Sequence, residues 1–264
     1  MEVWIKLSVL SILQGVAEFL PISSSGHLVL FQSLLGIDAP GEDLEILLHA
    51  GTMLSIVVFY RKLLIELISG FFRGEKQALK TVLCICISAV PAIVFYLLLK
   101  DGITKTYEST AFVGAMLLVT GVLLLTMKFL PSRELEVTPK RSLIVGIAQA
   151  IAILPGISRS GSTISCARIL GIKPEKAAAF SFIMSLPLIA GATLLMLFGH
   201  TGAEQAAQEV TVDFSCAMKL YAFALSAAVG YLSLKLLVKM LKKGIFWFFG
   251  VYCLIAGACA ILFI

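Results

Sequence analysis

The chain of 264 residues is 59 % hydrophobic and only 14 % charged, with a mean hydropathy of +1.00 and a formal net charge of +5. This composition excludes a soluble protein and is typical of an integral membrane protein. The small positive charge lies in loops between apolar runs, which excludes a nucleic-acid-binding surface.

The first predicted element, residues 2–36, is a helix-length apolar stretch, a break, and a second apolar stretch of about ten residues. In the break, Pro21 removes a backbone donor and a run of serines can cap the helix that follows. The start lacks a basic leader and contains Gln14 and Glu18, so we interpret it as mature protein and not as a signal peptide. Neither of the two apolar stretches can both enter and leave a bilayer by itself. We therefore predict that together they form a re-entrant hairpin.

Three apolar runs follow, at residues 46–60, 82–99 and 111–127. Each approaches the roughly 20 residues that a membrane-spanning helix needs. The first has only fifteen residues without charge, so it spans only with help from its flanks.

The second half repeats this order. Residues 141–172 are again broken, by Pro155 and Gly156, and apolar runs follow at 177–199, 220–234 and 245–264. The sequence therefore predicts one all-helical membrane domain over residues 1–264, with six transmembrane helices and two re-entrant helical hairpins. The six cysteines lie in or beside apolar runs without metal-ligand spacing, so we expect packed residues and neither disulfides nor ligands.

The two breaks are copies of one motif. Residues 14–26 read QGVAEFLPISSSG and residues 149–161 read QAIAILPGISRSG, with six identities at a constant offset of 135 residues. Glu18 aligns with Ile153, and Ser24 aligns with Arg159. The two halves therefore supply different parts of one site.

A repeat unit of one hairpin and three spans has an odd number of crossings, so the second copy must be inverted relative to the first. We expect inverted repeats at approximately 1–130 and 141–264, an arrangement associated with sites near the bilayer midplane. Broken backbone at membrane depth is tolerated only inside protein or along a wet cavity. The two hairpin tips should therefore meet in the interior.

Loop charges predict the orientation, because cytoplasmic loops carry an excess of Lys and Arg. The connection 199–215 has no Lys or Arg and has three acidic residues. We therefore place both termini and the mouth of the first hairpin outside the cytoplasm. The basic residues assigned to the cytoplasmic side are Arg61, Lys62, Arg73, Lys76, Lys80, Lys128, Arg133, Lys140, Arg141, Lys173, Lys176, Lys239, Lys242 and Lys243.

Ionisable residues at membrane depth cost several kcal/mol unless they are paired or hydrated, which makes Glu18, His27 and Arg159 functional candidates. Gln14 and Glu18 are four residues apart and project from one face of a helix. The set of Glu18, Ser24 and His27 contains a base, a nucleophile and an acid, the parts that a phosphoryl-transfer hydrolase needs.

Each break also opens a short helix whose free N–H groups and positive dipole end form an anion site. Arg159 adds a planar fork that can donate two hydrogen bonds to phosphate oxygens. Together these features suit phosphate. The residues at the two helix starts are Ser23, Ser24, Ser25, Gly26 and His27 in the first copy, and Ser158, Arg159, Ser160, Gly161, Ser162 and Thr163 in the second.

Two segments carry a family resemblance. The segment QGVAEFLPISSSGH fits an (E/Q)xxxE pattern with its serine loop, and PGISRSGST fits the signature PGxSRSxxT. The chain resembles the bacterial undecaprenyl-diphosphate phosphatases, the bacitracin-resistance family. The resemblance implies a bacterial inner-membrane enzyme that removes the terminal phosphate of a polyprenyl diphosphate lipid on the extracytoplasmic side, using Mg2+ or Ca2+. The long prenyl tail should stay among the membrane lipids.

The resemblance also implies residue roles. Glu18 would act as base or metal ligand, and Arg159 would stabilise charge on the transferring phosphoryl group. Ser24 would attack, or His27 would attack instead of donating a proton, and these two alternatives stay open. Gln14 occupies the first acidic position of the pattern, which removes one anionic metal ligand. The residues expected to bind substrate are Gln14, Ser23, Ser25, Gly26, Ser158, Ser160, Gly161 and Thr163.

Simpler interpretations compete with these roles. Glu18 and Arg159 could form a structural ion pair, and the serines could serve as helix caps alone. The rival function is a lipid-phosphate transporter or flippase, since carriers also use inverted repeats with broken helices. His49 and His200 lie outside the repeated break, so we interpret them as ordinary helix-face and loop residues. Small residues on the helix faces would permit a homodimer.

Overall fold

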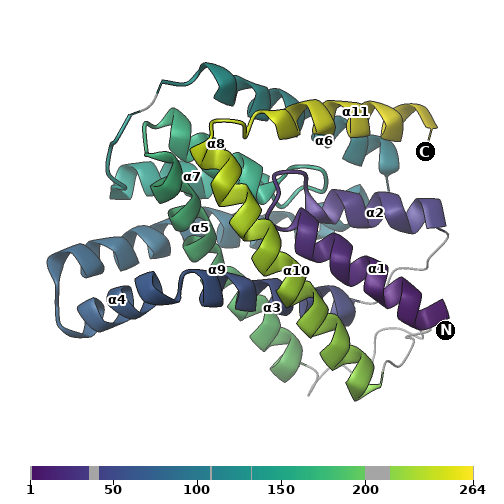
Figure 1. Cartoon of the computed structure of the whole chain (residues 1–264), viewed down its shortest axis with the longest axis horizontal. Coiled ribbons are helices and arrows are strands. Elements are labelled where there is room, and N and C mark those ends of the chain that lie inside the picture. The colour runs from purple at the N-terminus through teal and green to yellow at the C-terminus, as the bar shows by residue number, and fades with distance from the viewer. Residues whose placement is uncertain (1, 36–41, 108, 132, 200–214, 264) are drawn as a thin grey trace.

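The computed structural model describes residues 2–35, 42–107, 109–131, 133–199 and 215–263 (Figure 1). Within these residues the regular elements are helices, apart from one isolated parallel bridge between Leu135 and Ile172. The helices in chain order are α1 (Glu2–Ala17), α2 (Ser24–Leu35), α3 (Glu42–Phe59), α4 (Arg61–Phe72), α5 (Lys76–Thr106), α6 (Thr110–Thr126), the short η1 (Met127–Phe129), α7 (Pro139–Ile151), α8 (Arg159–Ile169), α9 (Pro174–Gly199), α10 (Cys216–Lys242) and α11 (Phe248–Phe263).

The six predicted apolar runs correspond to α3, α5, α6, α9, α10 and α11. In the part of the chain that the structure describes, three segments are long and apolar enough to cross a membrane, namely Lys76–Leu99, Thr110–Phe129 and Cys216–Lys242. Three shorter apolar helices accompany them, at Val3–Ala17, Ile46–Phe59 and Phe248–Phe263. The prediction of an all-helical membrane protein is confirmed at this level. All six cysteines are free; Cys84 and Cys253 are packed in the interior, whereas Cys86, Cys216 and Cys259 are exposed.

Helix α4 was not predicted. It follows α3 after a kink at Tyr60, where φ is −96° and ψ is 16°, and leads into the 31-residue helix α5. Leu64 and Leu67 are three residues apart and pack on the cluster that contains Cys84 of α5, while the face with Lys62 is exposed. This one-sided packing explains the helix, because an amphipathic segment is stabilised by the apolar face that it buries.

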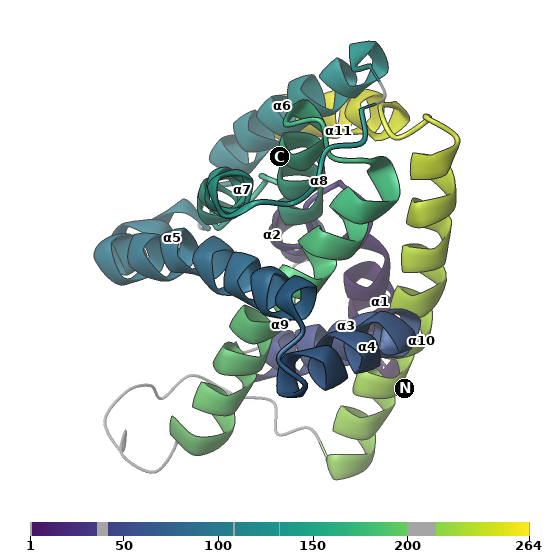
Figure 2. The same ribbon diagram turned by 90° about the vertical axis from the view of Figure 1, so that its left-hand side faces the viewer.

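The two broken segments lie at the centre of the molecule (Figure 2). The first hairpin is α1, the break 18–23 and α2; the second hairpin is α7, the break 152–158 and α8. Helix α1 packs on α10 of the second half, and α7 packs on α5 of the first half. Helices α3 and α9 contact each other, and so do α6 and α11. Each hairpin is therefore held by a long helix of the opposite half.

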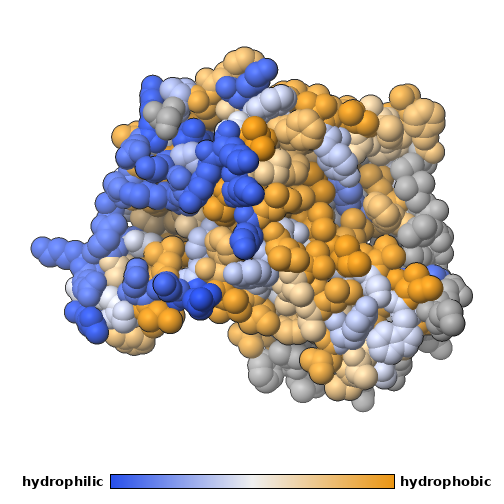
Figure 3. Space-filling model, in the orientation of Figure 1, coloured by the Kyte–Doolittle hydropathy of each residue, from blue (hydrophilic) through white to orange (hydrophobic). Residues whose placement is uncertain are grey.

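Hydrophilic residues gather at one end of the molecule. Figure 3 shows them on the left of the face drawn, over α4, the start of α7 and the turn after α10, and apolar residues over much of the rest. Both labelled termini lie on the opposite side in Figure 1. Long apolar helices between a hydrophilic end and the end with the termini are the arrangement expected of a membrane protein.

The hydrophilic end also holds the connection before α7 in place. Leu135 pairs with Ile172, Lys173 Nζ lies 2.8 Å from Glu134 Oε1, and Glu136 pairs with Lys176. The hydrogen bond from Lys173 lowers the pKa of the exposed Glu134 carboxyl. This connection therefore lies against the turn between α8 and α9.

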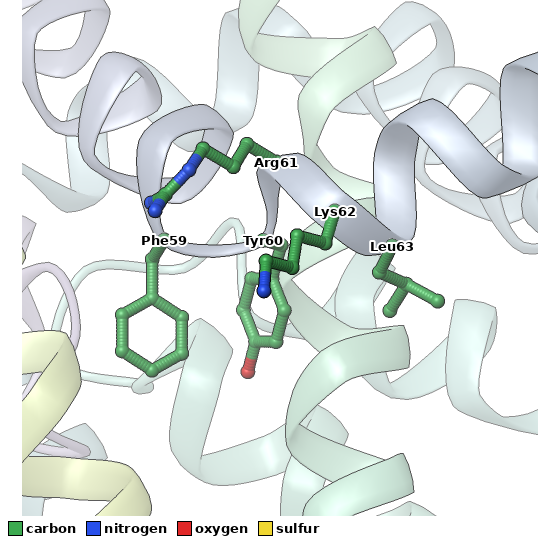
Figure 4. A pocket seen from close by; sticks show the side chains of 5 residues that line it. All are labelled: Phe59, Tyr60, Arg61, Lys62 and Leu63. Carbon is green, nitrogen blue, oxygen red and sulfur yellow. The ribbon is translucent and has the colours of Figure 1, made fainter.

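A pocket of about 310 Å³ lies at the kink between α3 and α4 (Figure 4). Five consecutive residues line it: Phe59, Tyr60, Arg61, Lys62 and Leu63. None of them belongs to the predicted site. The residues predicted to form the site therefore lie outside this pocket.

Replacing Gly156 by alanine is expected to destabilise the protein. Gly156 has φ of 94°, and a Cβ there would meet the carbonyl oxygen of Val113 and lie 2.7 Å from Cβ of Met116. The left-handed backbone costs about 1–2 kcal/mol, and overpacking adds about 1–3 kcal/mol. Thermal unfolding in detergent measures the loss. Gly74→Ala is the matched control, because φ is 72° there and nothing lies within 4 Å of the added atom. Equal losses in both variants would contradict the tight packing of the second tip.

Candidate active site at the hairpin tips

The tips of the two hairpins are in contact, as the repeat predicted. The backbone N–H of Gly156 donates to Ser23 Oγ at 3.1 Å, and Ser160 Oγ lies 3.5 Å from the carbonyl oxygen of Leu20. A Cβ at Gly26 would lie 2.9 Å from Cα of Gly156, so the two backbones approach closely. This approach brings residues about 135 positions apart in the sequence into one site.

Aligned serines cap the second helix of each hairpin. Ser23 Oγ accepts the N–H of Gly26 at 3.2 Å, and Ser158 Oγ accepts the N–H of Gly161 at 3.1 Å. Ser23 has φ of 69°, which is rare for a residue with a side chain and is characteristic of strained functional segments. The capping interpretation therefore applies to Ser23 and Ser158. It does not apply to Ser24, whose hydroxyl donates to the Glu18 carboxylate.

Glu18 is the centre of the site. Its side chain is 3 % exposed, and Oε1 is paired with the guanidinium of Arg159, whose side chain is 22 % exposed. The other oxygen, Oε2, accepts hydrogen bonds from Gln14 Nε2 at 3.1 Å and from Ser24 Oγ at 2.9 Å. The carboxylate thus joins a hydroxyl of the first hairpin to the arginine of the second. A partly exposed guanidinium beside a hydroxyl is suited to bind a phosphate from outside.

His49 also approaches this cluster, which its interpretation as an ordinary helix-face residue did not anticipate. Its Nε2 lies 3.4 Å from Oε2 of Glu18, and its side chain is 32 % exposed. His49 comes from α3, outside both repeated motifs. No spacing in the sequence links it to Glu18, because only the packing of α3 beside α1 brings the two together. His200 lies outside the described residues.

His27 makes its contacts away from Glu18. Its Nδ1 lies 2.9 Å from the carbonyl oxygen of Ser23, and its Nε2 lies 2.7 Å from the hydroxyl of Tyr252. The imidazole also stacks on the Tyr252 ring, with centroids 5.6 Å apart. Both ring nitrogens therefore connect the strained tip of the first hairpin to α11. Neither Tyr252 nor this arrangement was predicted from the sequence.

Thr120 of α6 is a further residue that sequence reasoning missed. Its hydroxyl donates to the carbonyl oxygen of Gly156 at 2.9 Å and accepts the N–H of Ser158 at 3.1 Å. Nothing in the local sequence of an apolar helix distinguishes this threonine from a packing residue. In the structure, Thr120 satisfies two backbone groups of the broken segment and so fixes the second tip.

The other predicted residues contact one another around the tips. Ser158 Oγ lies 3.2 Å from Ser160 Oγ, and Ser25 Oγ lies 3.5 Å from Ser23 Oγ. Thr163 donates to the carbonyl oxygen of Arg159 at 2.7 Å and lies 2.5 Å from Ser181 Oγ of α9. Through these two contacts, the Thr163 hydroxyl connects the first turn of α8, which carries Arg159, to α9.

The comparison with known families agrees with the two motifs. A family model described as bacitracin resistance protein BacA matches residues 7–259. The chain belongs to the BacA family. The match includes both hairpins and all long helices, so it is not restricted to the motifs.

Curated relatives of this BacA-family chain share its full length. An undecaprenyl-diphosphatase of Halothermothrix orenii is 40 % identical over 267 residues, covering 99 % of this chain and 98 % of the relative. An undecaprenyl-diphosphatase of Methanosphaera stadtmanae is 38 % identical over 273 residues, covering 96 % and 95 %. Undecaprenyl-diphosphatase 3 of Bacillus anthracis is 35 % identical over 269 residues, covering 98 % and 97 %. Three relatives from different organisms thus carry the same activity in their names.

The residues of the BacA site offer few metal ligands. Among the described residues, no group of three His, Cys, Asp or Glu side chains could hold a metal ion. Glu18 supplies one carboxylate, and Gln14 Oε1 is buried without a hydrogen-bond partner. Carboxylate and amide oxygens are the ligand types that Mg2+ and Ca2+ use, and Mg2+ often combines one or two carboxylates with substrate phosphates. The donor set therefore fits a cation that shares its coordination with a diphosphate.

Proposed function

We propose that this chain hydrolyses undecaprenyl diphosphate to undecaprenyl phosphate and inorganic phosphate. The observation that carries the proposal is the Glu18 carboxylate, which contacts the Ser24 hydroxyl on one side and the Arg159 guanidinium on the other. The names of the full-length relatives support the substrate. In the cell, this reaction recycles the lipid that carries cell-wall precursors and gives resistance to bacitracin.

Arg159 binds the substrate in this mechanism. In the free protein its guanidinium pairs with Glu18. A diphosphate offers more anionic oxygens in a better geometry for the planar fork, so the terminal phosphate draws Arg159 away from the carboxylate. This exchange leaves Oε1 of Glu18 without its strongest partner and makes the carboxylate a better base. Substrate binding thereby activates the site.

Ser24 attacks the terminal phosphorus while Glu18 accepts its proton, which is supported by their 2.9 Å hydrogen bond. A bond forms between Ser24 Oγ and phosphorus, the bond to the bridging oxygen breaks, and undecaprenyl phosphate leaves. Glu18 releases this proton to solvent and then deprotonates a water molecule, which attacks phosphorus. The bond between phosphorus and Ser24 Oγ breaks, inorganic phosphate leaves, and Ser24 takes the proton back from Glu18. The contacts of His27 with Ser23 and Tyr252 favour Ser24 as the nucleophile. The role of His27 as proton donor stays a prediction.

Removing divalent cations with EDTA is expected to abolish phosphate release, and Mg2+ or Ca2+ should restore it. Glu18 and Gln14 are the residues that we propose to hold the cation. When bound, the cation would neutralise charge on the diphosphate oxygens. A colorimetric phosphate assay with and without EDTA measures this dependence. Full activity in EDTA would contradict a role for the cation.

The same proposal includes the topology. We propose six spans and two re-entrant hairpins, with inverted repeats at about 1–130 and 141–264, and the packing of each hairpin against the opposite half supports it. The site opens to the extracytoplasmic side of the inner membrane, because the basic connections gather at the other end. The substrate headgroup enters between helices while its prenyl tail remains among the lipids. A homodimer stays a prediction.

Phosphate release from undecaprenyl diphosphate by detergent-purified protein tests the function. Wild type should release phosphate with Mg2+ or Ca2+ present, and folded Ser24→Ala and Arg159→Ala variants should not. A well-folded wild type that releases none would exclude the enzyme and favour a lipid-phosphate carrier, which needs the arginine but no nucleophile.

A further inference from the structure

We infer that His49 is a positioning residue of this site, which holds Oε2 of Glu18 so that the carboxylate stays oriented toward Ser24 when Arg159 moves to the phosphate. The inference rests on the proposed function. It begins from the 3.4 Å approach of His49 Nε2 to Oε2 of Glu18. Neither repeated motif contains His49.

The carboxylate needs such a partner because Arg159 has two tasks. In the free protein Arg159 fixes Oε1 of Glu18, but in the substrate complex its guanidinium binds phosphate. Gln14 cannot replace it as an independent anchor, since it lies one turn from Glu18 on the same chain segment and moves with it. Ser24 cannot replace it either, because its hydroxyl reacts. His49 contacts Oε2 and belongs to neither hairpin.

Helix α3 gives His49 a fixed backbone. Ser226 of α10 donates its hydroxyl to the carbonyl oxygen of Leu48 at 3.2 Å, directly before His49. Thr52 donates to the carbonyl oxygen of His49 at 2.9 Å, and Ser55 donates to that of Ala227 at 2.7 Å. The bonds of Ser226 and Ser55 tie α3 to α10 on both sides of His49, and the Thr52 bond lies within α3. The imidazole can therefore serve as a fixed reference for a carboxylate carried on the broken hairpin.

The side chain also has suitable access and chemistry. It is 32 % exposed, whereas the Glu18 side chain that it approaches is 3 % exposed. An imidazole N–H at Nε2 can hold a carboxylate oxygen in place with a single donor. A lysine in this place would bind the substrate itself. The position is therefore suited to orientation of Glu18 and not to capture of the headgroup.

Two variants of His49 test the inference against wild type in the phosphate-release assay. Alanine removes the donor, and glutamine keeps an N–H at similar reach. We expect His49→Ala to lower kcat about ten- to hundredfold, the usual effect of losing a residue that orients a catalytic group, with KM changed less than about twofold. His49→Gln should recover most of the rate. Thermal unfolding of each variant shows whether it is folded.

Ser233→Ala is the matched control, since it removes a side-chain hydrogen bond from α10, at 2.9 Å to Val229, without contacting Glu18. Its kcat should equal that of wild type. A folded His49→Ala variant with wild-type kcat would overturn the inference. So would a glutamine variant as slow as the alanine variant, or a rise in KM alone. An inactive wild type would overturn the proposed function and this inference with it.

Discussion

Replacing Arg159 by lysine is expected to lower phosphate release from undecaprenyl diphosphate about a hundredfold, and replacing it by alanine about a thousandfold. Lysine keeps the positive charge beside Glu18, so the fold should survive, but it cannot donate two parallel hydrogen bonds to phosphate. Alanine also removes the charge. Steady-state kinetics with purified variants measures both effects.

The alanine variant needs a stability control. Without Arg159, the nearly buried Glu18 carboxylate loses its ionic partner, and breaking such a pair costs about 3–5 kcal/mol. The lysine variant separates the loss of activity from the loss of stability, because it retains a cation beside Glu18. Arg168→Lys provides a matched substitution on the same helix, where the guanidinium donates to the carbonyl oxygen of Ile172 at 3.1 Å. Arg168→Lys should keep its rate. If Arg159→Lys also kept a wild-type rate, the phosphate clamp would have to lie elsewhere.

Replacing Ser24 by alanine is expected to lower the rate at least about a thousandfold, as loss of a nucleophile does in other hydrolases. The substitution removes one hydroxyl and one hydrogen bond to Glu18, so the protein should stay folded. Transfer of phosphate to Ser24 can be followed in wild type by rapid quench and mass spectrometry. The alanine variant should form no phosphoprotein.

Ser11→Ala and His27→Ala complete this comparison. Ser11 is a buried serine of α1 that donates only locally, to the carbonyl oxygen of Leu7 at 2.7 Å, so its loss should leave kcat unchanged. His27→Ala should lower thermal stability, since His27 connects Ser23 to Tyr252, and leave a measurable rate. The reverse result, an inactive His27 variant and an active Ser24 variant, would make histidine the nucleophile.

Much of the site followed from the repeated motif. Glu18, Ser24 and Arg159 were predicted to share a site, and the structure places them in one chain of contacts. The prediction was possible because the breaks are local features: proline, glycine and serine interrupt a helix wherever they lie. His49, Thr120 and Tyr252 could not be found in this way. Each lies in an apolar helix without a distinguishing neighbour, and its polar group has a partner only after the helices pack.

The sequence by itself determined that the protein lies in a membrane, where its helices are, and where two segments are broken. It could do so because hydropathy and backbone chemistry act over a few residues. Only the tertiary structure decided which hydroxyl caps and which one reaches the carboxylate: Ser23 and Ser24 are neighbours, yet the first binds backbone N–H groups of both hairpins and the second binds Glu18. It also decided that His27 faces Tyr252 and that His49 faces Glu18. These choices depend on packing between helices far apart in the chain, and no local pattern encodes them.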